Sequence, residues 1–180
     1  MDASLAQACV PATFGTPTLF GARVLSIEAS LVTNFTASVP AAYRFTQPSI
    51  EVRAATFCNV TVTYTHPGQD DEVHVEAWLP VSNPGWNGRL QATGGGSWAA
   101  GRFALGYQTM TGAIGDGYVA TATDAGLSTD PFLGAYEWAL LSPGNVNLHK
   151  LNDFGSVSLN DQVGDLHIGR TGLTERRIDL

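Results

Sequence analysis

Two neighbouring segments alternate apolar and polar side chains, and this pattern constrains the fold more than any other feature. The segments are residues 58–65 and 73–79, in which one side holds only apolar side chains: Val60, Val62, Tyr64, Val73, Val75, Ala77 and Leu79. A period of two indicates a β-strand with one buried and one polar face. Residues 66–72 between them, His-Pro-Gly-Gln-Asp-Asp-Glu, are rich in turn formers. We therefore predict two antiparallel strands joined by a loop.

A strand–helix–strand unit is predicted next. Residues 89–93 form a short third strand that runs directly into the glycines at 94–96. A helix follows, because apolar residues recur at spacings of four, three and four: Phe103, Tyr107, Met110 and Ile114. Residues 118–123 form the fourth strand. Such a unit joins parallel strands, so the expected fold class is α/β, with a mixed sheet that starts from an antiparallel hairpin. The pattern fits a partial α/β-hydrolase fold, incomplete at the C-terminus.

The two ends of the chain give weaker patterns. Four prolines interrupt residues 1–56, so we expect an extended arm with short strands there, one of them within residues 23–32. Residues 147–163 are predicted to form a further helix. Its expected inward-facing side chains are Leu148, Leu151, Phe154 and Leu159.

The glycine-rich stretch Gly94-Gly95-Gly96-Ser97 is the most informative local motif. Consecutive glycines allow positive φ and leave successive N–H groups exposed. In α/β hydrolases a loop between a strand and its helix supplies part of the oxyanion hole. We therefore name Gly94, Gly95, Gly96 and Ser97 as oxyanion-loop candidates. A plain tight turn is the alternative, whereas a phosphate loop is excluded because its lysine is absent.

No residue matches the nucleophile of such a hydrolase, whose motif is G-x-S-x-G. Ser97 and Ser128 each have the first glycine but lack the second. We expect the nucleophile strand beyond residue 163 and name no catalytic residue. Asp124 directly follows the predicted strand 118–123. The triad acid of these hydrolases comes after the serine in the sequence, and the serine is expected beyond residue 163. We therefore interpret Asp124 as turn-forming.

Charge and composition exclude several classes of function. The formal net charge is −7, which disfavours nucleic acid as a partner. No run of apolar residues approaches the roughly 20 that a membrane helix needs. The histidines show no metal-ligand spacing such as H-E-x-x-H, and we interpret each as solvated or hydrogen-bonded: His66, His74, His149 and His167.

Two features indicate an extracellular protein, although the first residues do not form a signal peptide. Asn34-Phe35-Thr36 and Asn59-Val60-Thr61 are glycosylation sequons. The chain also has two cysteines, Cys9 and Cys58, which either pair in a disulfide or stay as free thiols. We expect glycans on Asn34 and Asn59.

Several segments together resemble the fungal tannase/feruloyl esterase family of secreted α/β hydrolases. They occur in the expected order and are residues 57–68, 73–80, 86–96, 117–126 and 151–161. The resemblance implies hydrolysis of phenolic acid esters, such as feruloyl or galloyl esters, by a Ser-His-Asp triad. It implies a disulfide between Cys9 and Cys58, and places the Gly94–Gly96 loop beside the active site. Calcium is expected only in the family's lid domain, so we expect no cofactor in this chain.

From residue 164 the sequence no longer looks like the family, since two glycines and a charged cluster replace the expected helix. We therefore divide the chain into a hydrolase-like part, 1–163, and a divergent tail, 164–180, as a truncation or frameshift would give. The expected function is that of a carboxylic ester hydrolase by resemblance, inactive as this chain because the triad is missing. A non-catalytic fragment that binds phenolics or glycans, and a non-functional product, are the alternatives.

Overall fold

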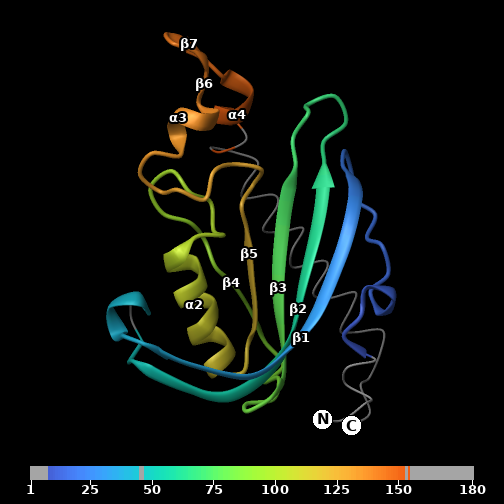
Figure 1. Ribbon diagram of the computed structural model, residues 1–180, viewed down its shortest axis with the longest axis vertical. Coiled ribbons are helices and arrows are strands. Elements are labelled where there is room, and N and C mark those ends of the chain that lie inside the picture. Colours follow the sequence, from blue (N-terminus) through green and yellow to red (C-terminus); the bar gives the residue numbers. More distant parts are fainter. Residues whose placement is uncertain (1–7, 45–46, 153, 155–180) are drawn as a thin grey trace.

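A mixed five-stranded sheet forms the centre of the molecule (Figure 1). The computed structural model describes residues 8–44, 47–152 and 154. The strands are β1 (Arg23–Val39), β2 (Ile50–Thr65), β3 (Val73–Ser82), β4 (Leu90–Ala92) and β5 (Val119–Thr123). Their order across the sheet is β1-β2-β3-β5-β4, and only the β4–β5 pair is parallel. The predicted mixed sheet of a partial α/β fold is confirmed.

Helix α2 (Ala104–Gly115) is the longest helix among the described residues; it connects β4 to β5 and covers one face of the sheet (Figure 1). The remaining elements are short: η1 (Pro11–Thr13), η2 (Ala41–Tyr43), α3 (Ala135–Trp138), β6 (Leu140–Ser142), β7 (Asn145–Val146) and α4 (Leu148–Asn152). The predicted hairpin corresponds to β2 and β3, and the predicted strand–helix–strand unit corresponds to β4, α2 and β5.

The N-terminal region differs from the extended arm with short strands that we expected. β1 is 17 residues long and pairs with β2 along almost its whole length. The prolines do not interrupt it, because Pro40 comes directly after its last residue. Asn34 and Ala54 have positive φ, 56° and 52°, close to register shifts in this pair. These irregularities accompany a bend that carries the end of the hairpin beneath α2 (Figure 1).

Arg44 fastens the bent hairpin to the end of α2. Its buried guanidinium forms an ion pair with Asp116, which directly follows the helix. It also donates to the carbonyl oxygen of Pro48 and to Oε1 of Gln47, both at 2.6 Å. A cation near a helix C-terminus is favourable because it faces the negative end of the helix dipole.

Apolar side chains pack on both faces of the sheet. The cluster between the sheet and α2 consists of Val52, Ala55, Phe57, Trp78, Met110, Ala113, Ile114, Ala120 and Ala122. The prediction of one buried and one polar face is wrong for β3. Glu76 and Trp78, on the side expected to be polar, are 5% and 8% exposed, whereas Ala77 and Leu79 are only half-buried. The reason is that α2 packs over the side expected to face solvent.

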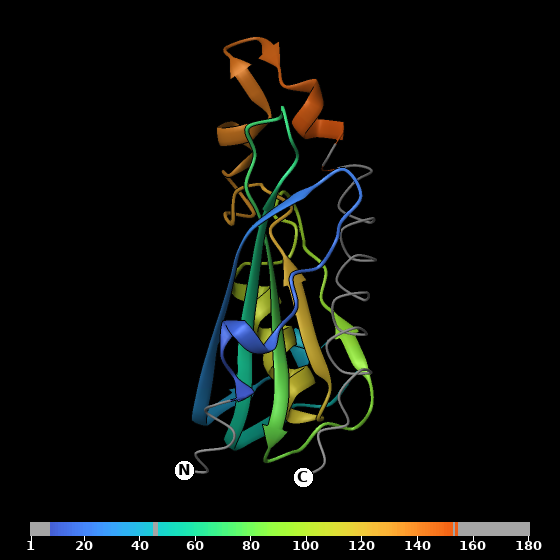
Figure 2. The ribbon, with the colours of Figure 1, turned by 90° about the vertical axis from the view of Figure 1, so that its right-hand side faces the viewer.

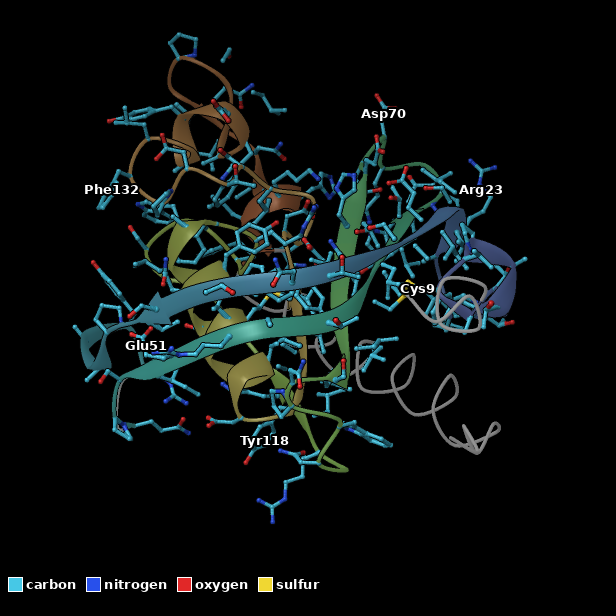
Figure 3. All side chains as sticks on the ribbon, turned by 60° about the horizontal axis from the view of Figure 1, so that its bottom comes forward. Cys9, Arg23, Glu51, Asp70, Tyr118 and Phe132 are labelled. Atoms are coloured by element: carbon cyan, nitrogen blue, oxygen red, sulfur yellow. A yellow bond between two sulfur atoms is a disulfide. The ribbon has the colours of Figure 1, made fainter. Side chains whose placement is uncertain are left out.

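The expected disulfide between Cys9 and Cys58 is present and ties the N-terminal segment to β2 (Figure 3). Its Cα atoms are 5.7 Å apart. Both cysteines are buried in a small cluster with Val60. Partly buried side chains complete the cluster: Phe14, Ile27, Ala29, Leu31 and Leu79. The bridge thus helps to cover the face of the sheet opposite to α2.

Short elements α3, β6, β7 and α4 lie together beyond the carboxyl ends of β4 and β5 (Figures 1 and 2). Leu151 and Phe154 pack against Ala125, Leu127 and Trp138, as their predicted inward orientation requires. Leu148 is 73% exposed, so its predicted inward orientation is wrong; it is the first residue of α4 and lies outside this cluster. The predicted helix beyond residue 154 and the boundary at 163 lie outside the described residues.

Candidate active site

The glycine-rich loop leaves the carboxyl end of β4 and returns to the carboxyl end of β5. At its start, the N–H and Oγ1 of Thr93 both donate to the carbonyl oxygen of Thr121, at 2.7 and 3.0 Å. At its end, the N–H of Arg102 donates to the carbonyl oxygen of Thr123 at 3.2 Å. Both stems of the loop are thus fixed to β5. Carboxyl ends of parallel strands are where ligands bind in open α/β sheets.

A tight turn at Gly96–Ala99 shapes the tip of the loop. The N–H of Gly96 donates to the carbonyl oxygen of Ala99 at 3.0 Å, and the reciprocal bond measures 3.2 Å. Ser97 has the positive φ, 56°, that we expected of the glycines. Gly95 is required for a different reason: a Cβ there would lie 1.8 Å from the carbonyl oxygen of Ala100. The loop therefore needs Gly95 for close packing of backbone on backbone.

The loop candidates differ in whether their N–H groups are already used. The N–H of Gly96 is bonded within the turn, and that of Trp98 donates to the carbonyl oxygen of Pro131 at 3.2 Å. Within the described part of the chain, the N–H groups of Gly94, Gly95 and Ser97 make no hydrogen bond. No described residue occupies these three donors. Whether they form an oxyanion hole stays a prediction.

Next to the loop lies a buried network of charged side chains that we did not predict from the sequence. Arg102, the residue that ends the loop, donates from Nε to Oε2 of Glu76 at 3.1 Å and from NH1 to Oδ2 of Asp124 at 3.2 Å. The side chains of Glu76 and Asp124 are 6% and 8% exposed. The hydroxyl of Tyr107 donates to Glu76 Oε2 at 2.8 Å, and the indole of Trp78 donates to Oε1 at the same distance. Arg102 thus links α2, β3 and β5 at one point.

Electrostatics favour this arrangement. Burial alone would lower the pKa of the Arg102 guanidinium, but Tyr107, Glu76 and Asp124 outweigh it and raise the pKa above its usual value. Burial and the adjacent Glu76 carboxylate raise the pKa of Tyr107, so its hydroxyl stays a hydrogen-bond donor. Glu76 could have been noticed in the sequence as the only acidic residue within the predicted strand 73–79. Its partner could not, because Arg102 is 26 residues away.

Asp124 fixes the backbone where β5 ends. Its Oδ1 accepts the N–H of Gly126 at 3.0 Å, in agreement with the turn-forming role inferred from the sequence. The same oxygen accepts the N–H of His74 at 2.9 Å, and Oδ2 lies 2.7 Å from Nδ1 of that histidine. His74 is hydrogen-bonded, as one of our two interpretations allowed. His149 is exposed, and His167 lies outside the described residues.

His66 and Asp71 stabilise the loop between β2 and β3. The nearly buried Asp71 carboxylate accepts hydrogen bonds from the Thr65 hydroxyl and the His66 backbone N–H, and it pairs with the His66 ring. Burial by itself raises the pKa of Asp71, but the bonds to His66 and Thr65 outweigh it and lower the pKa below 3.8. The ionised carboxylate is therefore the form that stabilises this loop.

Replacing the Asp71 carboxylate should make the free energy of unfolding less dependent on pH in the acid range. Because its pKa is lowered on folding, Asp71 stabilises the fold fully above about pH 4, and this contribution is lost as the pH falls through its folded-state pKa. We expect Asp71→Asn to lower the free energy of unfolding by about 1 kcal/mol at pH 7 and by less at pH 3. Urea unfolding at both pH values measures this, with Asp70→Asn, an exposed neighbour, as the control. An equal loss at both pH values would contradict the role of the charge.

Two neighbouring glycines of the loop offer a matched pair of substitutions. Gly95→Ala would place a Cβ within 2 Å of two backbone carbonyl oxygens, whereas Gly96→Ala meets only the Phe103 ring at 3.7 Å. We expect Gly95→Ala to lower the free energy of unfolding by about 2 kcal/mol and Gly96→Ala by less than about 0.5 kcal/mol. Urea unfolding of both variants checks this. Equal effects would show that the loop is not packed as described.

Fold and loop together define a class: a partial α/β fold with a free N–H loop where its parallel strands end. Comparison with known proteins agrees with this fold. The chain is 47% identical over 106 residues to a probable feruloyl esterase of Arthroderma benhamiae, and 36% identical over 108 residues to a tannase of Aspergillus oryzae. Each match includes 59% of this chain, but 19% and 17% of the relatives. The chain thus spans about a fifth of the length of these curated relatives.

A solved structure gives the same result. Tannin acyl hydrolase from Aspergillus niger matches with a TM-score of 0.67 and 26% identity, over 99% of this chain and 30% of that protein. No protein-family model matches the chain. The chain is therefore a homologue of fungal feruloyl esterases and tannases, and its resemblance to this ester hydrolase family is confirmed.

Over the described ranges, His, Cys, Asp and Glu side chains form no group of three or more that could hold a metal ion. The calcium expected in the lid domain concerns none of these residues and stays a prediction. No helix in the described part of the chain is long and apolar enough to cross a bilayer.

Proposed function

We propose that this chain forms the N-terminal part of the catalytic domain of a carboxylic ester hydrolase that acts on esters of phenolic acids. Its contribution is the loop Gly94–Ser97, whose N–H groups bind the oxyanion that develops on the ester carbonyl. The observation that carries this proposal is the set of three N–H groups, of Gly94, Gly95 and Ser97, that make no hydrogen bond within the described chain. The loop lies where β4 and β5 end, and both of its stems are fixed to β5.

Chemically, such donors act when a nucleophile attacks the ester carbonyl and negative charge moves onto the carbonyl oxygen. Preorganised N–H groups stabilise this charge, and each contributes about 3 kcal/mol where it has been measured. Rigid stems matter because a donor that must first be ordered loses part of its contribution. The hydrogen bonds of Thr93 and Arg102 to β5 supply this rigidity.

The substrate class follows from the relatives, whose names specify a feruloyl esterase and a tannase. Ferulic and gallic acids share an aromatic ring with oxygen substituents and a carboxyl group that forms the ester. The 180-residue chain contains no G-x-S-x-G motif, so we expect no hydrolysis of methyl ferulate by the purified chain. Turnover that a serine-directed phosphonate inhibits would contradict this expectation.

Titration with acetate tests the anion-binding role of the loop in the chain itself. In ¹⁵N-resolved NMR spectra we expect acetate to move the amide proton signals of Gly94, Gly95 and Ser97 downfield. The amide of Gly96 should move less, because it already donates to Ala99. Chloride at the same ionic strength is the control. Equal shifts with both salts, or shifts confined to other loops, would contradict the proposal.

An extracellular location with glycans on Asn34 and Asn59 is part of the same proposal. Asn34 supports it, because this sequon is exposed at the irregular part of β1, where Asn34 has a φ of 56°. Asn59 is half-buried in the middle of β2. Expression through a eukaryotic secretory pathway, followed by glycosidase treatment and mass spectrometry, tests both sites. An unchanged mass would contradict glycosylation.

A further inference from the structure

Trp98 lies at the tip of the glycine-rich loop and is 43% exposed. It belongs to the Gly96–Ala99 turn, and its N–H is bonded to the carbonyl oxygen of Pro131. The backbone that carries the ring is therefore fixed on both sides. A large aromatic ring held rigidly and left half-exposed beside free N–H groups is placed for contact with a ligand.

Other aromatic rings support Trp98 from one side. The ring centroids of Trp98 and Phe154 are 5.6 Å apart, and those of Trp98 and Trp138 are 6.2 Å apart. Trp138 is only 6% exposed, yet its indole N–H has no acceptor within the described chain. Trp138 therefore belongs to the buried support of Trp98.

Residues 130–136 extend this aromatic surface. The Oδ1 of Asp130 accepts the N–H groups of Phe132 and Leu133 at 2.8 and 3.0 Å, and these bonds lower the pKa of Asp130. The segment is thus ordered although its side chains are exposed: Phe132 by 79%, Leu133 by 64% and Tyr136 by 74%. Figure 3 shows Phe132 at the outer edge of this end of the molecule. Exposed apolar groups gathered in this way mark binding surfaces.

We propose that Trp98 is the platform on which the aromatic ring of the phenolic acyl group stacks. The proposal rests on the proposed function and adds its ring-binding residue. The carbonyl oxygen of the ester would face the N–H groups of Gly94, Gly95 and Ser97, and the ring would lie on the exposed face of Trp98 at the loop tip. Trp138, which is buried behind Trp98, holds the ring of Trp98 in place.

Ferulate binding to the full 180-residue chain, measured by NMR titration, tests whether Trp98 is this platform. We expect Trp98→Leu to raise the Kd by about 3- to 10-fold, the effect of losing one aromatic contact. Trp98→Phe keeps a ring and should stay within about twofold of the original chain. Trp86→Leu is the matched control, since Trp86 is 44% exposed but lies in the loop between β3 and β4. No change in Trp98→Leu, or an equal loss in Trp86→Leu, would overturn the proposal.

Ligand fragments separate this inference from the proposed function. If 2-methoxyphenol, which has the ring but no carboxylate, perturbs the Trp98 indole signal, the platform holds even when acetate leaves the loop amides unmoved. If acetate moves the loop amides but Trp98→Leu binds ferulate normally, the platform is wrong and the loop stands.

Discussion

Arg102→Met is expected to lower the free energy of unfolding by about 3 kcal/mol. Methionine is an unbranched, apolar side chain of similar length. The substitution therefore removes, among the described residues, the only cation that contacts both Glu76 and Asp124. Both carboxylates are more than nine-tenths buried. Removing one partner of a buried ion pair is costly because the other charge is left without compensation in a poorly solvated site. The loss should be visible as a lower urea midpoint.

The controls for this prediction come from the same chain. Arg89→Met removes an arginine whose neighbourhood is exposed, and we expect a loss below about 0.5 kcal/mol. Adding Glu76→Gln and Asp124→Asn to Arg102→Met should recover part of the stability, because the uncompensated charges are then gone. A loss no larger than that of Arg89→Met would contradict the network.

Loss of the disulfide is expected to have the largest effect. Replacing both Cys9 and Cys58 by alanine removes the disulfide, whose two cysteines are 49 residues apart in the sequence. In the chain-entropy description, cross-linking a loop of this length stabilises a fold by about 4 kcal/mol. Alanine keeps part of the apolar packing around Val60, so the change reports mainly on the bridge.

Urea unfolding of the oxidised chain, the reduced chain and the double alanine variant measures this effect. We expect the reduced chain and the variant to be destabilised alike and by several kcal/mol. If the double alanine variant unfolds at the same urea concentration as the oxidised chain, the N-terminal segment does not hold the fold in the way described.

The sequence predicted those elements whose side chains follow a strong local period. The alternation in residues 58–65 and 73–79 predicted β2 and β3 because a strand places every second side chain on one face. The spacing of Phe103, Tyr107, Met110 and Ile114 predicted α2 in the same way. The resemblance supplied the pairing of Cys9 with Cys58.

Features that depend on distant parts of the chain were not predictable in this way. Alternation shows that β3 has two faces, but not which one α2 covers, so Glu76 and Trp78 were assigned to solvent. β1 was underestimated because its stability comes from pairing with β2 rather than from its own pattern. At the loop, sequence reasoning found the glycines but not Arg102, whose function depends on contacts with β3 and β5.

A chimera tests directly whether this chain contributes the oxyanion loop of an ester hydrolase. A segment of this chain that includes Gly94–Ser97 would replace its counterpart in the Arthroderma benhamiae feruloyl esterase, to which 106 residues of the chain are 47% identical. The kcat for methyl ferulate would then be determined. We predict that the chimera is active. Gly95→Ala within it should lower kcat by about 100-fold, because its Cβ would collide with the carbonyl oxygens of Ala99 and Ala100 and displace the N–H groups of the loop. Gly96→Ala should stay within about threefold. A folded chimera in which Gly95→Ala leaves kcat unchanged would contradict the assignment of the loop Gly94–Ser97 to the oxyanion.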